Sequence, residues 1–173
     1  MTRKHIHYEV AFEDYLRSRG VPFVPVDEAR RPIFAGAKIK SFDLLVYPDG
    51  HLPWIADVKG RKFPYITDKG AKRYWENWVT KEDLDCLTEW QSVFGEEFEA
   101  RFVFAYWLDG PPDRWPAVRL HSFRGDYYAF LTVTLDDYQK HARPRSPSWQ
   151  TLSVSAKTFK NIARPVDVYG KEQ

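Results

Sequence analysis

Three residues in the first third of the chain have the types and the spacing of a metal-dependent hydrolytic site. Asp57 and Lys59 lie two positions apart in a segment, residues 54–59, whose other members are apolar. Residues i and i+2 of a β-strand point to the same face. We therefore expect the Asp57 carboxylate and the Lys59 ammonium to lie side by side, with Val58 turned into the opposite layer. Asp43, on the apolar segment before, comes close to Asp57 if the two segments pair.

This set predicts chemistry on a phosphate group. Two converging carboxylates repel each other unless a cation lies between them, and oxygen ligands suit Mg²⁺ or Mn²⁺. A neighbouring lysine can orient an attacking water or help to deprotonate it, and the metal neutralises charge that develops on a phosphate. The acid-x-lysine triplet alone is weak, because ordinary usage of charged residues gives roughly one by chance in a chain of this length. Its apolar surroundings and the Asp43 partner argue against a merely solvent-facing strand.

A helix and a β-hairpin are predicted around these residues. Residues from about Ile6 to Arg19 place their apolar side chains at helical spacing. Ser41–Tyr47 and Trp54–Lys59 have the composition of strands, and the Pro-Asp-Gly-His turn between them predicts a hairpin. We expect the second strand to stop before Gly60 and a loop to follow to about Val79. Val21–Val26 contains two prolines and is expected as an edge strand.

The rest of the chain continues this alternation of helices and strands. Thr80–Asp83 has the form of a capping box, with Asp where Glu is usual, and predicts a helix to about Phe94. Arg101–Leu108 is almost continuously apolar, which suggests a strand buried on both faces. Beyond Gly110 we expect strands in 118–123, 127–133 and 149–154, helices in 135–140 and 155–163, and a basic loop in 143–147.

The order of these elements indicates an α/β fold with a mixed central β-sheet flanked by helices. A length of 173 residues suits one domain, and no linker divides the chain. We expect a single domain over residues 1–173, with its core in about 6–108 and an extension of the same domain in about 111–173.

Composition favours a soluble cytoplasmic protein. The single cysteine, Cys86, cannot form an internal disulfide, which favours a reducing compartment. No apolar run approaches the roughly 18 residues of a membrane span, and no signal peptide is recognised. The net charge of +2 decides little. Acidic residues concentrate between Glu82 and Glu99. This uneven distribution of charge along the chain is compatible with a phosphate-binding face or with ordinary solvated helix surfaces.

The site pattern resembles the PD-(D/E)xK nuclease superfamily. In that fold an acidic residue near the start of the first helix joins an aspartate and a D/E-x-K strand of a hairpin. Glu9 matches the helix position, Asp43 the first strand, and Asp57 with Lys59 the second. The arrangement is similar to that of the archaeal Holliday-junction resolvases and covers about residues 6–108. The proline that often precedes the first aspartate is absent, because Phe42 stands there.

The resemblance implies a restriction-endonuclease-like fold and a Mg²⁺-dependent endonuclease that hydrolyses phosphodiester bonds in DNA. Asp43, Asp57 and the Val58 carbonyl would bind Mg²⁺ or Mn²⁺, Glu9 would complete the shell, and Lys59 would act on the water. DNA is the expected partner, no membrane is expected, and a homodimer is an open alternative because nucleases of this fold often dimerise. The string His-Tyr-Glu-Val-Ala-Phe-Glu at residues 7–13 is also similar to the signature of a bacterial family named HYExAFE, which supports relatedness and not activity.

Several further residues are candidates for contact with the substrate. Gln91 shares the inward face of its helix with Leu84 and Leu87, and a buried amide needs a partner. Many nucleases of this fold carry glutamine or lysine on that helix, so the resemblance implies that Gln91 positions phosphate or water, with a hydrogen-bonded core glutamine as the equal alternative. Loop tryptophans could stack on bases or simply anchor loops; they are Trp75, Trp78 and Trp115. Candidate phosphate contacts, none specific by itself, are Lys62, Lys72, Arg73, Arg143 and Arg145.

Two rival functions use the same features. A non-catalytic module of the same fold would bind nucleic acid or protein, but the complete set of Glu9, Asp43, Asp57 and Lys59 argues against a decayed site. A carbohydrate-active protein would explain the seven tryptophans and the paired acids. It does not explain Lys59 beside Asp57, since glycosidases need a carboxyl pair.

Overall fold

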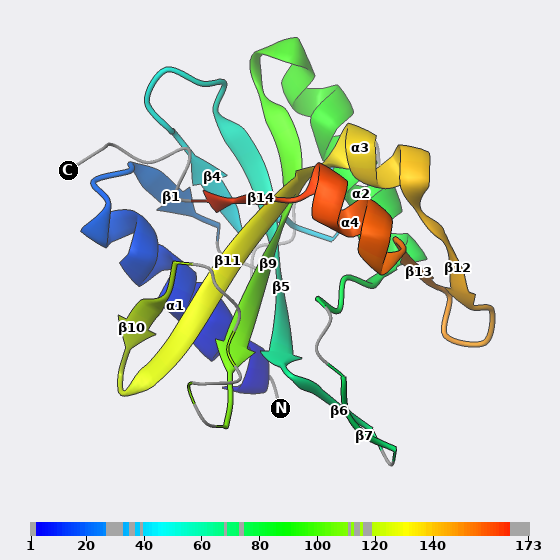
Figure 1. Ribbon diagram of the computed structural model, residues 1–173. Helices are drawn as coiled ribbons and strands as arrows, with labels where there is room; N and C mark the ends of the chain where they lie inside the picture. Colours follow the sequence, from blue (N-terminus) through cyan, green and yellow to red (C-terminus); the bar gives the residue numbers. More distant parts are fainter. Residues whose placement is uncertain are drawn as a thin grey trace.

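The computed structural model describes residues 3–26, 33–34, 37–38, 40–67, 69–72, 75–110, 112, 115 and 119–166. Over these residues the chain forms a curled mixed β-sheet with helices on both faces (Figure 1). This confirms the predicted α/β class with a mixed central sheet. None of the described helices is long and apolar enough to cross a membrane.

The central sheet is built around one long parallel pair of strands. β5 and β9 run parallel and pair over ten registered positions, from Trp54 with Glu99 to Phe63 with Leu108. All other neighbours in this sheet are antiparallel, in the order β1-β4-β5-β9-β11-β10, and β14 also pairs with β11. The strands are β1 (Phe23–Pro25), β4 (Leu44–Val46), β5 (Trp54–Phe63), β9 (Glu99–Leu108), β10 (His121–Phe123), β11 (Asp126–Thr134) and β14 (Arg164–Pro165).

Helix α1 (Arg3–Ser18) covers one face of this sheet. Its apolar stripe is buried against side chains from β4, β5, β9 and β11, so the predicted helix and its inward face are confirmed. The buried residues of the stripe are Tyr8, Ala11, Phe12, Tyr15 and Leu16.

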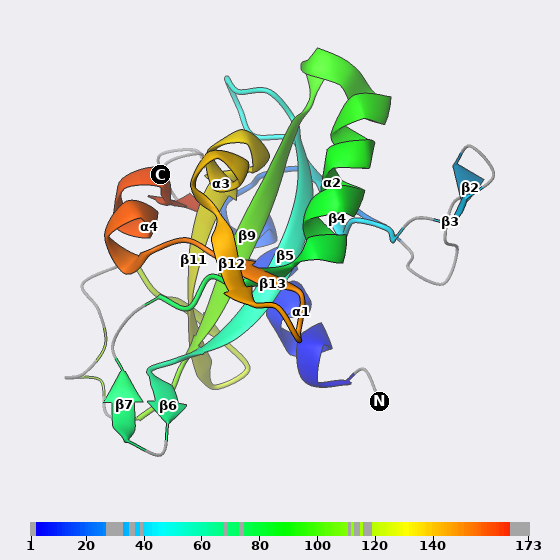
Figure 2. The same ribbon diagram turned by 90° about the vertical axis from the view of Figure 1, so that its right-hand side faces the viewer.

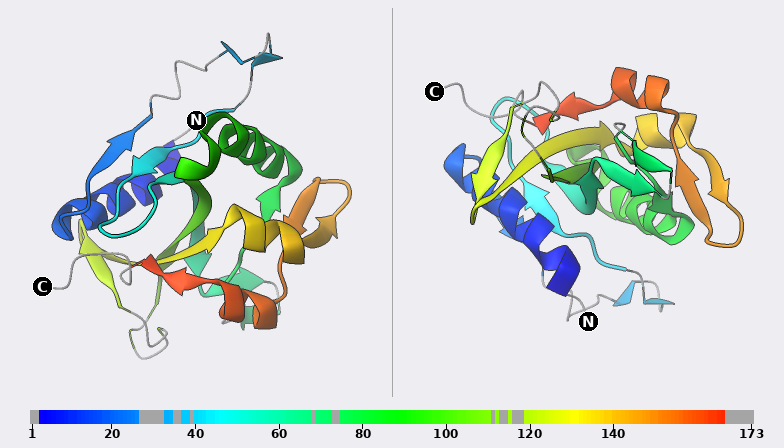
Figure 3. Two further views of the ribbon diagram at one scale, coloured as in Figure 1. Left: turned by 90° about the horizontal axis from the view of Figure 1, so that it is seen from above. Right: turned by 60° about the horizontal axis from the view of Figure 1, so that its bottom comes forward.

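Three helices cover the opposite face, as Figure 2 and the two views of Figure 3 show. They are α2 (Lys81–Phe94), α3 (Leu135–His141) and α4 (Ala156–Ile162). Leu87 and Trp90 from α2, Tyr138 from α3 and Phe159 from α4 are buried in one cluster with the sheet. The short 3-10 helix η1 (Gly95–Glu97) leads from α2 into β9.

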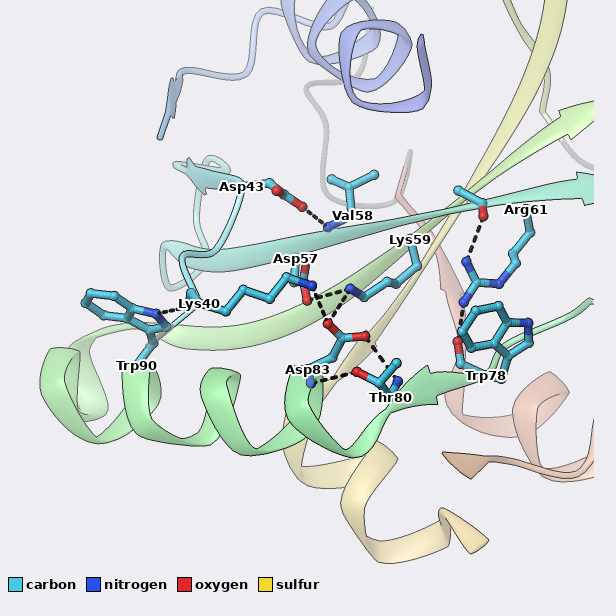
Figure 4. A network of polar contacts seen from close by, with 11 residues as sticks. Lys40, Asp43, Asp57, Val58, Lys59, Arg61, Trp78, Thr80, Asp83 and Trp90 are labelled. Atoms are coloured by element: carbon cyan, nitrogen blue, oxygen red, sulfur yellow. Dashed lines mark hydrogen bonds and ion pairs between the residues drawn. The ribbon is translucent and has the colours of Figure 1, made fainter. Parts of the chain in front are cut away.

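Helix α2 begins with the predicted capping box. The Thr80 hydroxyl accepts a hydrogen bond from the Asp83 amide at 3.0 Å, and the Asp83 carboxylate accepts one from the Thr80 amide at 3.1 Å. Two of the otherwise unpaired amides of the first turn are thereby satisfied. The box also holds the Asp83 carboxylate at the start of the helix, beside β5 (Figure 4).

The predicted hairpin of β4 and β5 is confirmed, with Leu44 opposite Ala56 and Val46 opposite Trp54. β1 is the predicted proline-containing edge strand and pairs with β4. The expectation that β5 stops before Gly60 is wrong. The strand runs on to Phe63, because β9 offers backbone partners along its whole length and Gly60 has room beside Tyr8 only as a glycine.

Smaller sheets extend the structure at the end of β5. The predicted loop 143–147 is wrong, because residues 143–146 form β12 (Arg143–Ser146), which pairs with β13 (Thr151–Ser153). β13 in turn pairs with β8 (Val79–Thr80), just before α2. The predicted loop before Val79 contains a ribbon that projects from the end of β5 (Figures 1 and 2). This ribbon comprises β6 (Tyr65–Thr67) and β7 (Gly70–Lys72), and β2 (Ile33–Phe34) pairs separately with β3 (Ala37–Lys38).

Gly60 of β5 lies directly against the Tyr8 ring of α1, and we predict that Gly60→Ala destabilises the fold. A Cβ at this position would lie 2.1 Å from Cδ2 and 2.4 Å from Cγ of Tyr8, so the ring and its helix would have to move. Overpacking of this kind costs about 1–3 kcal/mol. Urea unfolding measures the loss. In a Tyr8→Ala background the same substitution should cost much less, and equal costs in both backgrounds would contradict the packing argument.

Candidate active site

Strand β5 carries the centre of the candidate site on one face. Asp57 and Lys59 point toward α2, while Val58 packs in the layer of α1 (Figure 4). The Lys59 Nζ lies 3.1 Å from Asp57 Oδ2. The expected alternation along this strand is therefore confirmed. The next residue on the same face is Arg61. The sequence pattern did not mark this residue as part of the site.

Asp43 lies just before β4 and extends the pairing of the hairpin by one more backbone hydrogen bond. Its amide donates to the Ala56 carbonyl at 3.0 Å. Its carboxylate reaches across to β5, where Oδ2 accepts a hydrogen bond from the Val58 amide at 2.7 Å. The Asp57 carboxyl lies close enough to act on Asp43, and the two residues are only 7% and 6% exposed. The structure thus brings the two predicted aspartates together in a buried pair.

The surroundings of Asp43 disfavour its negative charge. Burial raises the pKa of Asp43 well above its ordinary value, and the neighbouring charges of Asp57 and Glu9 raise it further. The hydrogen bond from the Val58 amide opposes this rise in pKa and does not overcome it. Glu9 is half-buried on α1 and close enough to act on Asp43 through its charge. The three predicted acids therefore lie close enough together that the negative charges of Asp57 and Glu9 disfavour ionisation of Asp43.

Lys59 is held by a carboxylate that the sequence analysis did not assign to the site. Its Nζ lies 3.0 Å from Asp83 Oδ1, and Lys40 Nζ approaches the same oxygen at 2.6 Å (Figure 4). Burial by itself would lower the pKa of Lys59, but the carboxylates of Asp57 and Asp83 outweigh it and raise that pKa. These carboxylates therefore favour the protonated, cationic form of Lys59.

The pKa of Asp83 is shifted in the opposite direction from that of Asp43. Burial alone would raise its pKa, but Lys59 and Lys40 more than offset this and hold the pKa of Asp83 well below its usual range. The residue was recognisable in the sequence only as the acidic member of the capping box. The signal that it also belongs to the site was tertiary, since it comes from α2 packing over Lys59.

Arg61 is an unusual buried cation. It is 8% exposed, and its guanidinium donates to the Gly60 carbonyl at 2.7 Å and to the Trp78 carbonyl. It also lies over the Trp78 ring, 3.9 Å from the ring centroid. Within the described part of the chain, Arg61 makes no ion pair with a carboxylate, and burial lowers its pKa, an effect that more distant charges only partly offset.

Gln91 makes its hydrogen bonds away from this cluster, and its predicted role in positioning phosphate or water stays a prediction. Its amide nitrogen donates to the carbonyls of Gly95 and Phe98, each at 2.9 Å, and its carbonyl accepts from the Ala100 amide at 2.7 Å. The side chain thus ties the end of α2 to the start of β9. These bonds favour the alternative interpretation, in which Gln91 is a hydrogen-bonded structural glutamine.

The predicted phosphate contacts are scattered around this region. Lys62 pairs with Asp109 at 2.9 Å on the surface, and Arg145 lies 3.6 Å from Glu76. Arg143 is exposed on β12 and donates to the carbonyl of its neighbour Ala142. The side chain of Lys72 and all of Arg73 lie outside the described residues. The roles of these five residues in binding phosphate stay predictions.

The carboxylate oxygens of this site are ligands that suit a small hard cation. Asp43 and Asp57 supply buried carboxylate oxygens, and the raised pKa of Asp43 is the mark of a pair that lacks a positive charge between its members. In the described ranges, no three His, Cys, Asp or Glu side chains already form a closed metal-binding group. The pair would need Glu9, a backbone carbonyl or water to complete a shell, which is usual for Mg²⁺.

Comparison with known proteins finds a solved structure with a similar fold. No family model matches the chain, so the likeness of residues 7–13 to the HYExAFE family gains no support, and no curated protein matches it. Among solved structures, the chain is similar to Hjc of Archaeoglobus fulgidus, a Holliday junction resolvase from an archaeal hyperthermophile. The TM-score is 0.55, the identity 13%, and the alignment covers 95% of this chain and 99% of that one. At this identity the likeness shows a shared fold, with the restriction-endonuclease-like arrangement that was predicted.

We predict that Asp43→Asn stabilises the metal-free protein increasingly as pH rises above about 4. The folded state holds a proton on Asp43 at pH values where the unfolded state has released it, because the folded pKa is raised. Wild-type stability therefore falls as pH rises toward the folded pKa, and the amide removes that fall. Urea unfolding in a chelating buffer from about pH 4 to pH 8 tests this. A stability difference that is constant with pH would contradict it.

Asp83→Asn should show the reverse dependence. A lowered pKa adds stability above the ordinary aspartate pKa and loses it as pH falls toward the folded value. Near neutral pH the variant leaves Lys59 and Lys40 without one carboxylate, and breaking a buried pair costs about 3 kcal/mol. The deficit should shrink on acidification below about pH 4. The exposed Asp85→Asn variant of the same helix, which removes only a surface pair with Lys81, serves as the control.

Proposed function

We propose that this protein is a metal-dependent nuclease that hydrolyses phosphodiester bonds in DNA. The observation that carries the proposal is the buried carboxyl pair of Asp43 and Asp57, with the Lys59 ammonium beside Asp57. The fold shared with a Holliday junction resolvase supports it. A DNA partner follows from the same argument, while a homodimer and a cytoplasmic location stay predictions of the sequence.

Asp43 and Asp57 would hold Mg²⁺ or Mn²⁺, together with the Val58 carbonyl and with Glu9 directly or through water. When bound, such an ion supplies a water of lowered pKa and neutralises charge on the phosphate. Lys59 keeps its proton because two carboxylates surround it. It would therefore orient the attacking water and offer its charge to the phosphate oxygens as negative charge builds up on them.

Asp83 and Lys40 would act on Lys59 rather than on the substrate. Asp83 fixes the Lys59 ammonium from the side opposite Asp57, and the capping box fixes Asp83 in turn. Lys40 is 40% exposed and shares the same oxygen. It is therefore the cation of this group best placed to meet an incoming phosphate.

A second function, binding of nucleic acid without cleavage, is favoured by one observation. The Lys59 ammonium is already engaged by Asp57 and Asp83. In such a module the same cations would hold the phosphate backbone, and no metal would be needed for binding.

Cleavage assays separate these functions. We expect wild-type protein with Mg²⁺ or Mn²⁺ to cut at least one of plasmid, linear, single-stranded or branched DNA. Asp57→Asn and Lys59→Ala should each reduce the rate by about 100-fold or more, because each removes charge at the reacting phosphate. Asp136→Asn and Lys140→Ala are matched controls from an exposed pair on α3. If wild type and all four variants give the same background on every substrate, the nuclease proposal fails. Retained DNA binding would then favour the binding module.

Metal binding has its own measurement. Mn²⁺ should raise the melting temperature of the wild-type protein, with a stabilisation of about 2.7 kcal/mol at 100 times its dissociation constant. Asp43→Asn and Asp57→Asn should abolish this rise, and Asp136→Asn should keep it. A rise that survives in both site variants would place the ion elsewhere.

A further inference from the structure

A hollow of about 240 Å³ opens beside β13 and the segment that leads into β8. We call it the Trp78 hollow. Pockets for drug-sized ligands run about 300–1,000 Å³, so this one suits a single ring system. Its lining combines aromatic, charged and small residues from Trp75–Trp78, Arg145, Ser153, Val154 and Ala156.

The walls of the hollow are held firmly. The Asn77 amide donates to the Val154 carbonyl at 3.0 Å and accepts from the Val154 amide at 2.8 Å, which ties the two sides together. The Trp75 ring packs on Phe63 and Tyr106 with centroid separations of 4.7 and 4.4 Å. A ligand would therefore meet a preformed surface, with little ordering cost.

Trp78 brings an aromatic ring to the hollow, and two arginines lie near this ring. Its indole nitrogen donates to Glu76 at 2.8 Å, which sets the ring orientation. The Arg61 guanidinium lies 3.9 Å and that of Arg145 lies 5.6 Å from the ring centroid. Arg145 is 39% exposed and holds Glu76 only at 3.6 Å, so it is free to turn toward an incoming anion.

The hollow is connected to the candidate active site through β5. Asp57, Lys59 and Arg61 share one face of this strand, and Arg61 reaches Trp78 (Figure 4). Four residues of strand span roughly 13 Å. That is about four nucleotides of a stacked nucleic-acid strand and fewer of an extended one.

We infer that the Trp78 hollow binds one unpaired nucleobase of the strand whose phosphate lies at Asp43, Asp57 and Lys59. This deepens the proposed function and rests on it, since it names single-stranded or locally unpaired nucleic acid as the substrate class. The Trp78 ring can stack any base on a face that Arg145 leaves, and Arg145 can then pair with the adjoining phosphate. A base inside a duplex has both faces covered by its neighbours, so it must leave the stack to enter. The Arg145 guanidinium in the lining favours the anionic strand.

Anisotropy of a labelled oligonucleotide about 12 nucleotides long tests the inference. The full chain is used in chelating buffer, so that no cleavage occurs. Trp78→Ala should weaken binding of the single strand about 5- to 150-fold, the range of one stacked base, and change duplex binding by less than about twofold. Trp78→Phe should retain most of the affinity, because it keeps a ring. Trp149→Ala removes a 78% exposed tryptophan outside the hollow and should change binding of either strand less than about twofold.

A second arm needs no variant and therefore does not depend on how Trp78→Ala folds. The wild-type protein should bind an otherwise identical strand with abasic sites more weakly, by a factor in the same range. Equal affinity for the intact and the abasic strand would overturn the inference. Equal losses of single-strand and duplex binding in a folded Trp78→Ala variant would also overturn it.

Asp57→Asn separates this inference from the nuclease proposal. The variant should lose cleavage and keep its preference for intact over abasic single strands. Wild-type cleavage without that preference would refute the base site alone. The preference without any cleavage would refute the nuclease alone.

Discussion

Strand β5 is buried on both faces, and the strict alternation of its side chains determines most of what surrounds it. Ile55, Asp57, Lys59, Arg61 and Phe63 face α2 and the C-terminal helices. The intervening residues face α1, where Gly60 leaves room for Tyr8. The ten-position parallel pairing with β9 prevents any slip, because a shift of one residue would exchange the two faces and put the charges into the α1 core.

Burial of Lys59 and Asp83 is tolerated because each has an oppositely charged partner from a different element. Arg61 is held instead by backbone carbonyls and the Trp78 ring. The β-hairpin brings Asp43 to Asp57, α2 brings Asp83 to Lys59, and the segment before β4 brings Lys40 to Asp83. The helix cap and the site share one carboxylate, so the geometry of Lys59 depends on how α2 begins. At the pair Asp43–Asp57, the negative charge of Asp43 is not fully balanced, since burial and neighbouring charges both raise the pKa of Asp43. A cation is the chemical species that would balance it.

The last third of the chain is part of this arrangement. β11 pairs with β9 through eight positions within the central sheet, and α3 follows it directly. The Tyr138 hydroxyl of α3 donates to the carbonyls of Asn77 and Leu152 at 2.8 and 3.2 Å. These bonds hold the segment before β8 against β13, which forms the wall of the Trp78 hollow. The region after Gly110 thereby supports the wall of the Trp78 hollow.

The sequence alone determined the local features. Apolar periodicity predicted α1, the hairpin, α2 and β9, because amphipathic patterns follow from how each element buries one face. Alternation placed Asp57 and Lys59 together, and Thr80 with Asp83 marked the start of α2. Only the tertiary structure decided what these elements meet. It engaged Gln91 with backbone groups, brought Asp83 to Lys59, and set Arg61 against Trp78. The second half of β5 exists because the distant strand β9 offers it backbone partners. The contact between Arg61 and Trp78 joins residues 17 positions apart, and no local pattern records which residues will meet in this way.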